Sequence, residues 1–425
     1  MTTAELHGHF LAHPKACTDT RKITEDCIFF ALKGDNFDGN AYAEEALRKG
    51  AALAVVDDAQ YAVSDDFLLV KDVLTALQQL GKYHRHFCSA RVIALTGSNG
   101  KTTTKELINA VLSRKYNTIA TQGNLNNHIG VPLTLLSITP DTEIAIVEMG
   151  ANHQKEIEFL CGLAEPDFGY ITNFGKAHLE GFGGVEGVIK GKSELYDHLI
   201  GHGKSVFMNA DDPIQFEKLG SHIKKFGFST DKQDFYRISF VDADPFVRLT
   251  VEDIEISSKL IGSYNFTNCA AAVLMGKYFN VPLSEVKKAI EGYSPQNNRS
   301  QILEKNGNRI ILDAYNANPT SMAAALENFR RMKGENKVAI LGDMFELGET
   351  AGKEHQAIAD LAAEMGFSEV YLVGENFYFT DTNLKKFKAF DDFSAELKSS
   401  SLPDDALLLI KGSRGMALER TLELL

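Results

Sequence analysis

A glycine-rich stretch decides the fold: residues Ala94–Thr104 read ALTGSNGKTTT. An apolar, strand-like run, Val92–Thr96, leads into it, and a helical pattern, Thr102–Arg114, follows it. Gly97 and Gly100 permit a tight turn whose successive backbone N–H groups face a phosphate, and the helix N-terminus adds partial positive charge. The stretch therefore predicts a strand–loop–helix unit that binds a nucleotide.

The side chains of this stretch support the same interpretation. Lys101 can reach the outer phosphates of a nucleotide, and the hydroxyl of Thr102 can hold Mg²⁺. The general phosphate-loop pattern has a further glycine six residues before the lysine, where this chain has Leu95, so the match is partial. The alternative is a glycine-rich turn before an ordinary helix, and the strand–loop–helix context favours nucleotide binding. Since unrelated NTPases share such loops, the stretch identifies no reaction.

Length and charge limit the classes of protein. The chain has 425 residues, which at roughly 100–200 residues per domain predicts two to four domains. Hydrophobic residues make up 44% and charged residues 24%, as in ordinary globular proteins. The formal net charge of −13 argues against general binding to nucleic acid, which needs many Lys and Arg residues on one face. An anionic substrate stays compatible, because a local pocket can be positive on an acidic protein.

Cysteine usage and hydropathy indicate a cytoplasmic protein without membrane insertion. The five cysteines are scattered and form no CxxC pair, which argues against zinc and redox motifs and suits a reducing compartment. Residues Met1–Phe10 lack the long apolar stretch of a signal peptide. No apolar run reaches the ~20 residues that span a bilayer.

Strand-like and helical patterns divide the chain into three parts, which we expect to be α/β domains of residues 1–85, 86–298 and 299–425. The first has short strand-like runs and then a helical pattern, Asp72–Phe87. In the second, runs such as Val92–Thr96 and Glu143–Glu148 alternate with helical patterns, which indicates a parallel sheet covered on both faces.

The end of the second part and the whole of the third have patterns of their own. Apolar and polar residues alternate between Asp234 and Leu260, which indicates an antiparallel β insertion. The third part has a Rossmann-like rhythm of strand-like runs and helical patterns. Pro295 with Gln296–Asn298 is the expected hinge between the two.

Several segments, taken in order, resemble the Mur ligase family. The short loop form Thr96–Thr103 is similar to the loops of Mur ligases and folylpolyglutamate synthases. Four further segments match the Mur pattern: Thr121–Pro132, Val147–Ala151, Ile171–Glu180 and Asn209–Pro213. The resemblance implies three α/β domains: a small N-terminal domain for a UDP-linked substrate, a central parallel-sheet ATPase-like domain, and a C-terminal Rossmann-like domain.

Segments at both ends narrow the resemblance to members that add D-alanyl-D-alanine to UDP-N-acetylmuramoyl-tripeptide. They are Leu312–Pro319, Leu341–Gly348 and Lys411–Arg414 in the third part, and Asp19–Arg21, Phe30–Gly34 and Phe37–Gly39 in the first. Two departures are Thr20, where Ser is usual, and Asn40, where His is common. The resemblance implies a monomeric ligase of peptidoglycan precursor synthesis that uses ATP and Mg²⁺ and forms an acyl phosphate.

The resemblance also implies roles for individual residues. The expected nucleotide contacts are Gly97, Ser98, Asn99, Gly100, Lys101, Thr102, Thr103, Asn268, Arg299 and Asp313. The expected substrate contacts are Thr20, Arg21, Gly34, Asp38, Tyr315, Asn316 and Asn318. The expected catalytic residues are Lys101, Asn126, Asn127, His178, Lys192 and Arg299. Arg299 would reach the nucleotide only after the third domain closes over the second.

Four residues are expected at two Mg²⁺ sites beside the loop: Thr102, Glu148, His178 and Lys192. Glu148 ends an apolar run and would hold one Mg²⁺ together with Thr102. His178 is implied as a ligand of the second, although imidazole is a less usual partner for so hard a cation. Lys192 is implied to be carbamylated, which would place an anion beside the metals. The alternatives are an ordinary strand-end carboxylate, a satisfied polar histidine, and an unmodified lysine that serves a phosphate or is solvated.

Three alternative functions would differ from this one in the reaction that the protein catalyses or in having none. A sibling ligase would add a single amino acid to the same precursor line, and the segment Asp313–Pro319 argues against it. A switch NTPase would hydrolyse ATP or GTP without an amine acceptor. A non-catalytic UDP-sugar-binding protein would have no need of Lys101, Glu148 and His178.

Overall fold

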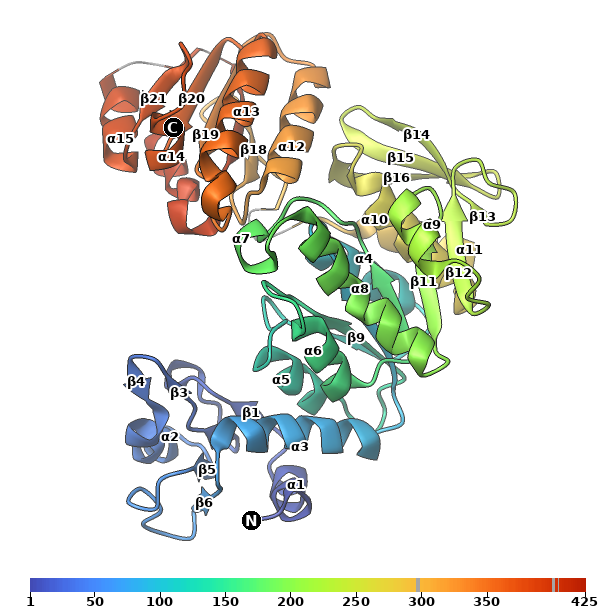
Figure 1. The fold of residues 1–425 in the computed structure, drawn as a ribbon, viewed down its shortest axis with the longest axis vertical. Coiled ribbons are helices and arrows are strands. Elements are labelled where there is room, and N and C mark those ends of the chain that lie inside the picture. Colours follow the sequence, from blue (N-terminus) through green and yellow to red (C-terminus); the bar gives the residue numbers. More distant parts are fainter. Residues whose placement is uncertain (296–298, 400–401, 404) are drawn as a thin grey trace.

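Three α/β units follow one another along the chain in the computed structural model, which describes residues 1–295, 299–399, 402–403 and 405–425. Figure 1 shows them in sequence order along the long axis of the molecule, with the N-terminal unit in blue and the C-terminal unit in orange and red. The α/β class with three units is therefore as expected. No helix of the described residues is long and apolar enough to cross a membrane.

The N-terminal unit is built on a parallel sheet in the order β1-β2-β5-β6. Its strands are β1 (Ala16–Cys17), β2 (Ile28–Phe30), β5 (Leu53–Val56) and β6 (Phe67–Leu69), its helices are α1 (Thr3–Ala12), α2 (Ala43–Arg48) and α3 (Val73–Phe87), and a short hairpin joins β3 (Lys33–Gly34) to β4 (Phe37–Asp38). Asp72 caps α3 by accepting a hydrogen bond from the backbone N–H of Thr75 at 2.7 Å. This helix leads out of the unit, as its pattern predicted.

The central unit contains a seven-stranded parallel sheet in the order β13-β12-β11-β10-β7-β9-β8. The strands are β7 (Arg91–Thr96), β8 (Thr118–Ala120), β9 (Ile144–Glu148), β10 (Phe168–Ile171), β11 (Ser205–Asn209), β12 (Lys225–Ser229) and β13 (Tyr236–Arg237). The helices are α4 (Lys101–Leu112), α5 (Gly130–Leu136), α6 (Glu156–Ala164), α7 (Leu179–Phe182), α8 (Val185–Gly201), α9 (Pro213–Leu219), α10 (Asn265–Tyr278) and α11 (Leu283–Gly292). Because β7 lies between β9 and β10, the ends of these three strands meet at one edge of the sheet.

The expected β insertion forms a separate antiparallel sheet, β14-β15-β16. Its strands are β14 (Ser239–Ala243), β15 (Phe246–Val251) and β16 (Ile254–Ile261). On β15 the buried side chains Val247, Leu249 and Val251 alternate with less buried ones, as the sequence pattern predicted. The first strand of the expected range, β13, instead pairs parallel with β12 in the main sheet.

The third unit has a six-stranded sheet in the order β17-β18-β22-β19-β20-β21, in which only the edge pair β17–β18 is antiparallel. The strands are β17 (Gln301–Lys305), β18 (Asn308–Asp313), β19 (Lys337–Gly342), β20 (Glu369–Val373), β21 (Lys385–Phe387) and β22 (Leu407–Lys411). The helices are α12 (Pro319–Arg331), α13 (Ala351–Glu364), α14 (Glu375–Tyr378) and α15 (Phe390–Ser399). The helical pattern after the last strand forms short 3-10 helices, Arg414–Met416 and Leu418–Leu424.

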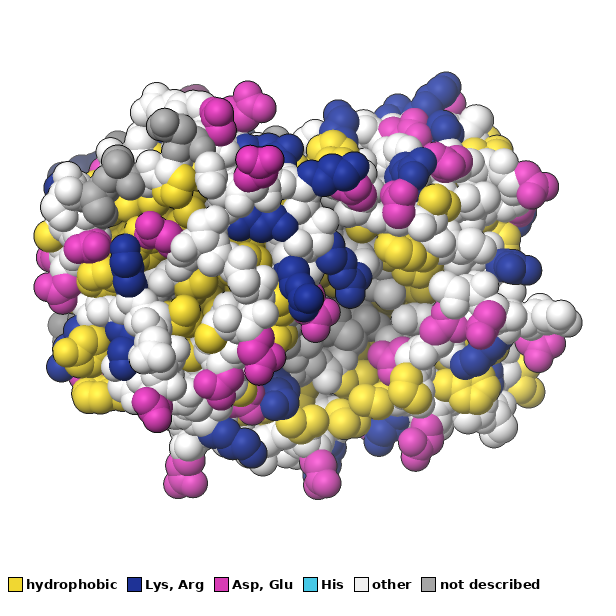
Figure 2. All heavy atoms as spheres, turned by 90° about the horizontal axis from the view of Figure 1, so that it is seen from above, with side chains coloured by type: hydrophobic (Ala, Val, Ile, Leu, Met, Phe, Trp, Pro, Cys, Tyr) yellow, Lys and Arg dark blue, Asp and Glu magenta, His cyan; other side chains and the backbone are white. Residues whose placement is uncertain are grey.

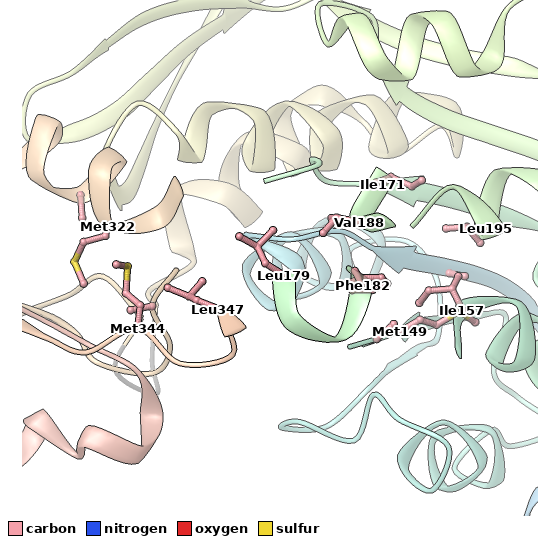
Figure 3. Close-up of a cluster of buried hydrophobic side chains, with 14 of the residues drawn as sticks. Met149, Ile157, Ile171, Leu179, Phe182, Val188, Leu195, Met322, Met344 and Leu347 are labelled. Atoms are coloured by element: carbon pink, nitrogen blue, oxygen red, sulfur yellow. The ribbon is translucent and has the colours of Figure 1, made fainter. Parts of the chain in front are cut away.

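The borders between the units stay predictions. Helix α3 continues to Phe87, two residues beyond the expected border at residue 85. Residues Gln296–Asn298 of the expected hinge lie outside the described residues. The central and third units nevertheless share one buried hydrophobic cluster. Figure 3 shows its member Leu179 of α7 beside Leu347 of the third unit, whereas Phe182 of the same helix lies toward Met149 and Ile157.

Candidate active site

A cleft of about 1270 Å³ lies between the central and third units, and the glycine-rich loop lines it. Residues 98–103 of the loop, the ends of β9 and β10 and the start of α12 all contribute to its wall. On the face seen from above, Figure 2 shows acidic and basic side chains interspersed over the described residues, rather than an extended basic surface. The positions of the predicted site residues are described below relative to this cleft.

Two glycines of the loop are required by its geometry. Gly97 has φ 141° and Gly100 has φ 79°, both in the region that favours glycine. A Cβ on Gly97 would lie 2.0 Å from the hydroxyl oxygen of Thr172, and one on Gly100 would lie 2.6 Å from Oδ1 of Asn268. The backbone of the loop therefore approaches β10 and α10 more closely than any side chain would allow.

Lys101 begins α4 directly behind these glycines and is folded back onto the loop. Its Nζ donates to the backbone oxygens of Gly97 at 2.8 Å and Ser98 at 3.3 Å. Burial lowers the pKa of Lys101, Arg299 lowers it further, and Glu148 opposes them. Phosphate oxygens of a bound nucleotide can take the place of these two backbone oxygens as hydrogen-bond acceptors for Lys101.

Buried Thr102 and Glu148, with half-buried Asn126, form a polar cluster next to Lys101. The Oε1 atom of Glu148 accepts hydrogen bonds from Nδ2 of Asn126 at 2.8 Å and from the hydroxyl of Thr102 at 3.3 Å. The side chain of Glu148 is 1% exposed, and its Oε2 has no hydrogen-bond partner among the described residues. A buried carboxylate oxygen without a partner is costly unless a cation or a donor reaches it.

Lys192 is completely buried on α8, which packs on the face of the sheet opposite α4. Its Nζ donates to the backbone oxygen of Ala151 at 2.9 Å and lies 4.9 Å from the centre of the Phe182 ring. Burial, and secondarily the charge of Lys101, lower the pKa of Lys192 well below its ordinary value. Both causes favour the neutral form of the amine, which is the nucleophilic one.

His178 precedes α7 with φ 54° and contacts the third unit. Its Nδ1 is hydrogen-bonded to the carboxylate of Glu346, and this contact holds the pKa of Glu346 below its ordinary value. A cation that approached His178 in this arrangement would have to use Nε2.

Residues of the third unit complete the cleft. The guanidinium of Arg299 lies 3.6 Å from the centre of the Tyr315 ring, a cation–π stack. Lys411 Nζ is 2.5 Å from Oδ2 of Asp313, whose Oδ1 accepts the backbone N–H of Ser300 at 3.0 Å. Arg299, Asp313, Tyr315, Asn316 and Asn318 all line the cleft.

The remaining predicted residues divide into two groups. Asn127 and Asn268 line the cleft, and each also has a local role. Asn127 Oδ1 accepts the N–H groups of Ile129 and Gly130, and Asn268 Oδ1 accepts the hydroxyl of Thr104. The described residues that line the cleft include none of the four substrate residues expected in the N-terminal unit: Thr20, Arg21, Gly34 and Asp38.

Those four lie in the 3-10 helix Thr20–Lys22 and the β3–β4 hairpin. Arg21 is paired with Asp19 at 2.8 Å, and its side chain is 85% exposed. Asp38 accepts the backbone and side-chain N–H groups of Asn40, and Asn40 Nδ2 also donates to Asp57 at 2.8 Å. Asn40, the departure from the family pattern, is buried, and its amide joins Asp38 to Asp57.

Three partners of the predicted site residues were not predicted, and one of them, Glu346, reaches from the third unit to the central one. Asn173, Glu346 and Lys411 each hold a predicted site residue: Asn99, His178 and Asp313. All three lie inside segments that carry the resemblance, but their pairings join positions distant in sequence. Among the described residues, no group of three or more His, Cys, Asp or Glu side chains is arranged to hold a metal ion by itself.

Comparison with known proteins follows the same division of the chain. The family model described as Mur ligase family, catalytic domain, matches residues 16–85, the Mur ligase middle domain matches 95–276, and the Mur ligase, glutamate ligase domain, matches 298–414. The UDP-N-acetylmuramoyl-tripeptide–D-alanyl-D-alanine ligases of Bacillus subtilis and Escherichia coli are 37% and 35% identical. The matches cover 84% and 86% of this chain and 81% and 82% of those proteins.

Solved structures agree with these relatives. A crystal structure of MurF from Acinetobacter baumannii is 30% identical with a TM-score of 0.86, over 99% of this chain and 97% of that one. The MurF ligase of Thermotoga maritima in complex with ADP is 26% identical with a TM-score of 0.84, over 97% of each chain.

Proposed function

The chain belongs to the Mur ligase family, and from that premise we propose that it joins D-alanyl-D-alanine to UDP-N-acetylmuramoyl-tripeptide with ATP. Relatives with this activity in their names match most of the chain, and one similar structure holds ADP. The reaction belongs to peptidoglycan precursor synthesis, which we place in the cytoplasm with the protein acting as a monomer.

The reaction has two steps. A carboxylate oxygen of the tripeptide attacks the γ-phosphorus of ATP, the bond to the ADP oxygen breaks, and an acyl phosphate forms. The dipeptide amine then attacks the acyl carbon, loses a proton, and phosphate leaves. Because the first step brings two anions together, cationic groups around the phosphates should dominate the rate. Lys101 and Arg299 are two of the cationic side chains that line the cleft, and the charge of Arg299 acts on Lys101.

A divalent cation fits the polar cluster. The unpartnered Oε2 of Glu148 supplies a hard anionic oxygen, and the hydroxyl of Thr102 lies on the same carboxylate. Mg²⁺ bound there would neutralise charge on the β- and γ-phosphates. Asn126 orients the carboxylate through its other oxygen. His178, through Nε2, is the residue we assign to a second Mg²⁺, with Asn127 near the reacting groups.

Lys192 is proposed to carry a carbamate. Its neutral amine would add to the carbon of CO₂, a C–N bond would form with loss of one proton, and the product would be an anion. The lowered pKa supports the addition, because a protonated amine has no free electron pair. The carbamate would then provide oxygen ligands that the buried amine lacks.

The outer units would bind the two substrates. We assign Thr20, Arg21, Gly34 and Asp38 to the UDP moiety, which places its peptide across the space between the N-terminal unit and the cleft. Asp313, Tyr315, Asn316 and Asn318 are assigned to the nucleotide and the incoming dipeptide. The stack of Arg299 on Tyr315 would hold the guanidinium toward the phosphates.

The single observation that carries the proposal is the buried Glu148 carboxylate, half satisfied by Asn126 and Thr102, beside a loop built for phosphate. The test mixes the protein with ATP, Mg²⁺, the UDP-linked tripeptide and D-alanyl-D-alanine and measures phosphate release. Release should require both substrates. Release with neither substrate, or with a single amino acid in place of the dipeptide, would reject the proposal.

A further inference from the structure

The first turn of α12 contacts the glycine-rich loop directly, across the border between the central and third units. Nδ2 of Asn318 donates to Oδ1 of Asn99 at 2.7 Å. Asn318 is also the N-cap of α12, since its Oδ1 accepts the N–H of Ser321 at 2.9 Å and its own N–H donates to the Ser321 hydroxyl at 3.1 Å. One amide side chain therefore holds both the start of a helix and a residue of the phosphate loop.

The backbone of Asn99 is held by two residues that directly follow β10, Thr172 and Asn173. Its N–H donates to Oδ1 of Asn173 at 3.0 Å. Its carbonyl oxygen accepts Nδ2 of Asn173 at 3.0 Å and the hydroxyl of Thr172 at 2.6 Å. Asn99 lies between Ser98 and Gly100, and all three residues line the cleft. A shift of the Asn99 side chain should therefore also move the part of the loop that is expected to bind phosphate.

Little space is left between the side chain of Asn99, Gly175 and the first turn of α12. A Cβ on Gly175 would lie 2.8 Å from Nδ2 of Asn99 and 3.2 Å from the hydroxyl oxygen of Thr320. That same hydroxyl accepts the backbone N–H of Lys176 at 2.9 Å, and Lys176 Nζ pairs with the buried carboxylate of Glu354 at 2.7 Å. The first turn of α12 is thus hydrogen-bonded both to the loop and to the segment after β10.

We propose that Asn318 is a positioning residue that couples docking of the third unit to the shape of the phosphate loop, through its hydrogen bond to Asn99. This inference rests on the proposed function for the identity of the nucleotide, but it concerns binding before any acceptor is present. If docking of the third unit raises the affinity of the loop for a nucleotide, a bound nucleotide must raise the equilibrium constant for docking by the same factor.

Asn318→Ser separates this role from helix capping. Serine is a good N-cap residue, but its hydroxyl is too short to reach Asn99. With ADP and Mg²⁺ and no other substrate, calorimetry should show binding about fivefold weaker than in the wild type, as expected for one lost hydrogen bond between neutral groups. Scattering profiles should show less compaction on ADP addition than in the wild type.

The control is Ser321→Ala, which removes the two hydrogen bonds of the Ser321 hydroxyl with the Asn318 backbone and leaves the bridge. It should bind ADP like the wild type, and equal weakening in both variants would assign the effect to the helix cap. In an Asn99→Ala background, Asn318→Ser should have no further effect, because the bridge is already lost.

Two results overturn the inference and keep it separate from the proposed function. Unchanged ADP affinity in Asn318→Ser, with only the KM for the dipeptide raised, would leave Asn318 as a contact to the dipeptide with no positioning role. Additive losses in the double variant would remove the coupling through Asn99. A wild-type protein that binds no ADP would instead reject the proposed function.

Discussion

The glycine-rich loop and the β3–β4 hairpin are both expected to meet a nucleotide, but their side chains are held very differently. Around the loop, Thr102, Glu148 and Lys192 are buried and held by contacts from other elements. In the N-terminal unit, Arg21 and Phe37 are exposed and have local contacts. Removing a buried polar group leaves its partners unsatisfied, whereas water replaces an exposed one. Substitutions should therefore cost far more in the cleft than in the N-terminal unit.

The largest effect is expected at the buried carboxylate. Glu148→Gln keeps the shape but removes the anionic oxygens, so kcat should fall by about 10³-fold, the scale of losing one preorganised electrostatic contact. Phosphate release at saturating ATP and Mg²⁺ measures this. Glu143→Gln, just before the same strand and exposed, is the matched control. A Glu148 variant with near-normal kcat would show that the cluster holds no cation.

Lys192 should give the next largest effect, about 10²-fold in kcat for Lys192→Ala. Bicarbonate with short carboxylic acids should restore part of the activity if a carbamate is the working form. Exposed Lys190→Ala, on the same helix, should be neutral. Loss without any rescue would favour an unmodified lysine.

Replacing Lys192 should have opposite effects on activity and on stability: activity should fall, but the folded state should become more stable. Since burial lowers the pKa of Lys192, the unfolded chain binds a proton that the folded chain does not, and this weakens folding below the ordinary value of 10.5. In bicarbonate-free buffer, Lys192→Met should raise Tm by about 2–4 °C for each kcal/mol relieved. Its advantage should shrink as pH rises toward 10.5, and an advantage independent of pH would contradict this account.

A moderate effect is expected where His178 meets the third unit. Glu346→Gln weakens the pairing with the imidazole but keeps the size, so kcat/KM should fall about three- to tenfold. Glu349→Gln, exposed three residues later, is the control. A rise in kcat/KM would instead mean that the pairing with Glu346 restrains His178.

The smallest effect is expected in the N-terminal unit. Arg21→Ala should raise the KM for the UDP-linked substrate about three- to tenfold with kcat unchanged, because an exposed contact to phosphate is screened by water. Arg48→Ala, exposed on α2, should change neither value. A fall in kcat comparable to that of Glu148→Gln would erase the contrast between the two regions.

Local pattern was enough for much of this protein. The apolar run before Gly97, the helix after it and the alternation along β15 each follow from the spacing of residues near in sequence. For the same reason, the phosphate loop and the strand-end position of Glu148 could be predicted. Short edge strands such as β8 and β21 were not, because three residues carry too little periodicity to be distinguished from a loop.

Only the tertiary structure decided how these pieces meet. The burial of Lys192 depends on packing within the central unit. The pairing of His178 with Glu346 and the bridge from Asn318 to Asn99 depend on how whole units pack. Hydropathy and residue spacing act over a few neighbours, whereas these contacts join positions 168 and 219 residues apart. The sequence by itself determined which chemical groups stand at the strand ends, and packing determined which of them lose water and which partner each one finds.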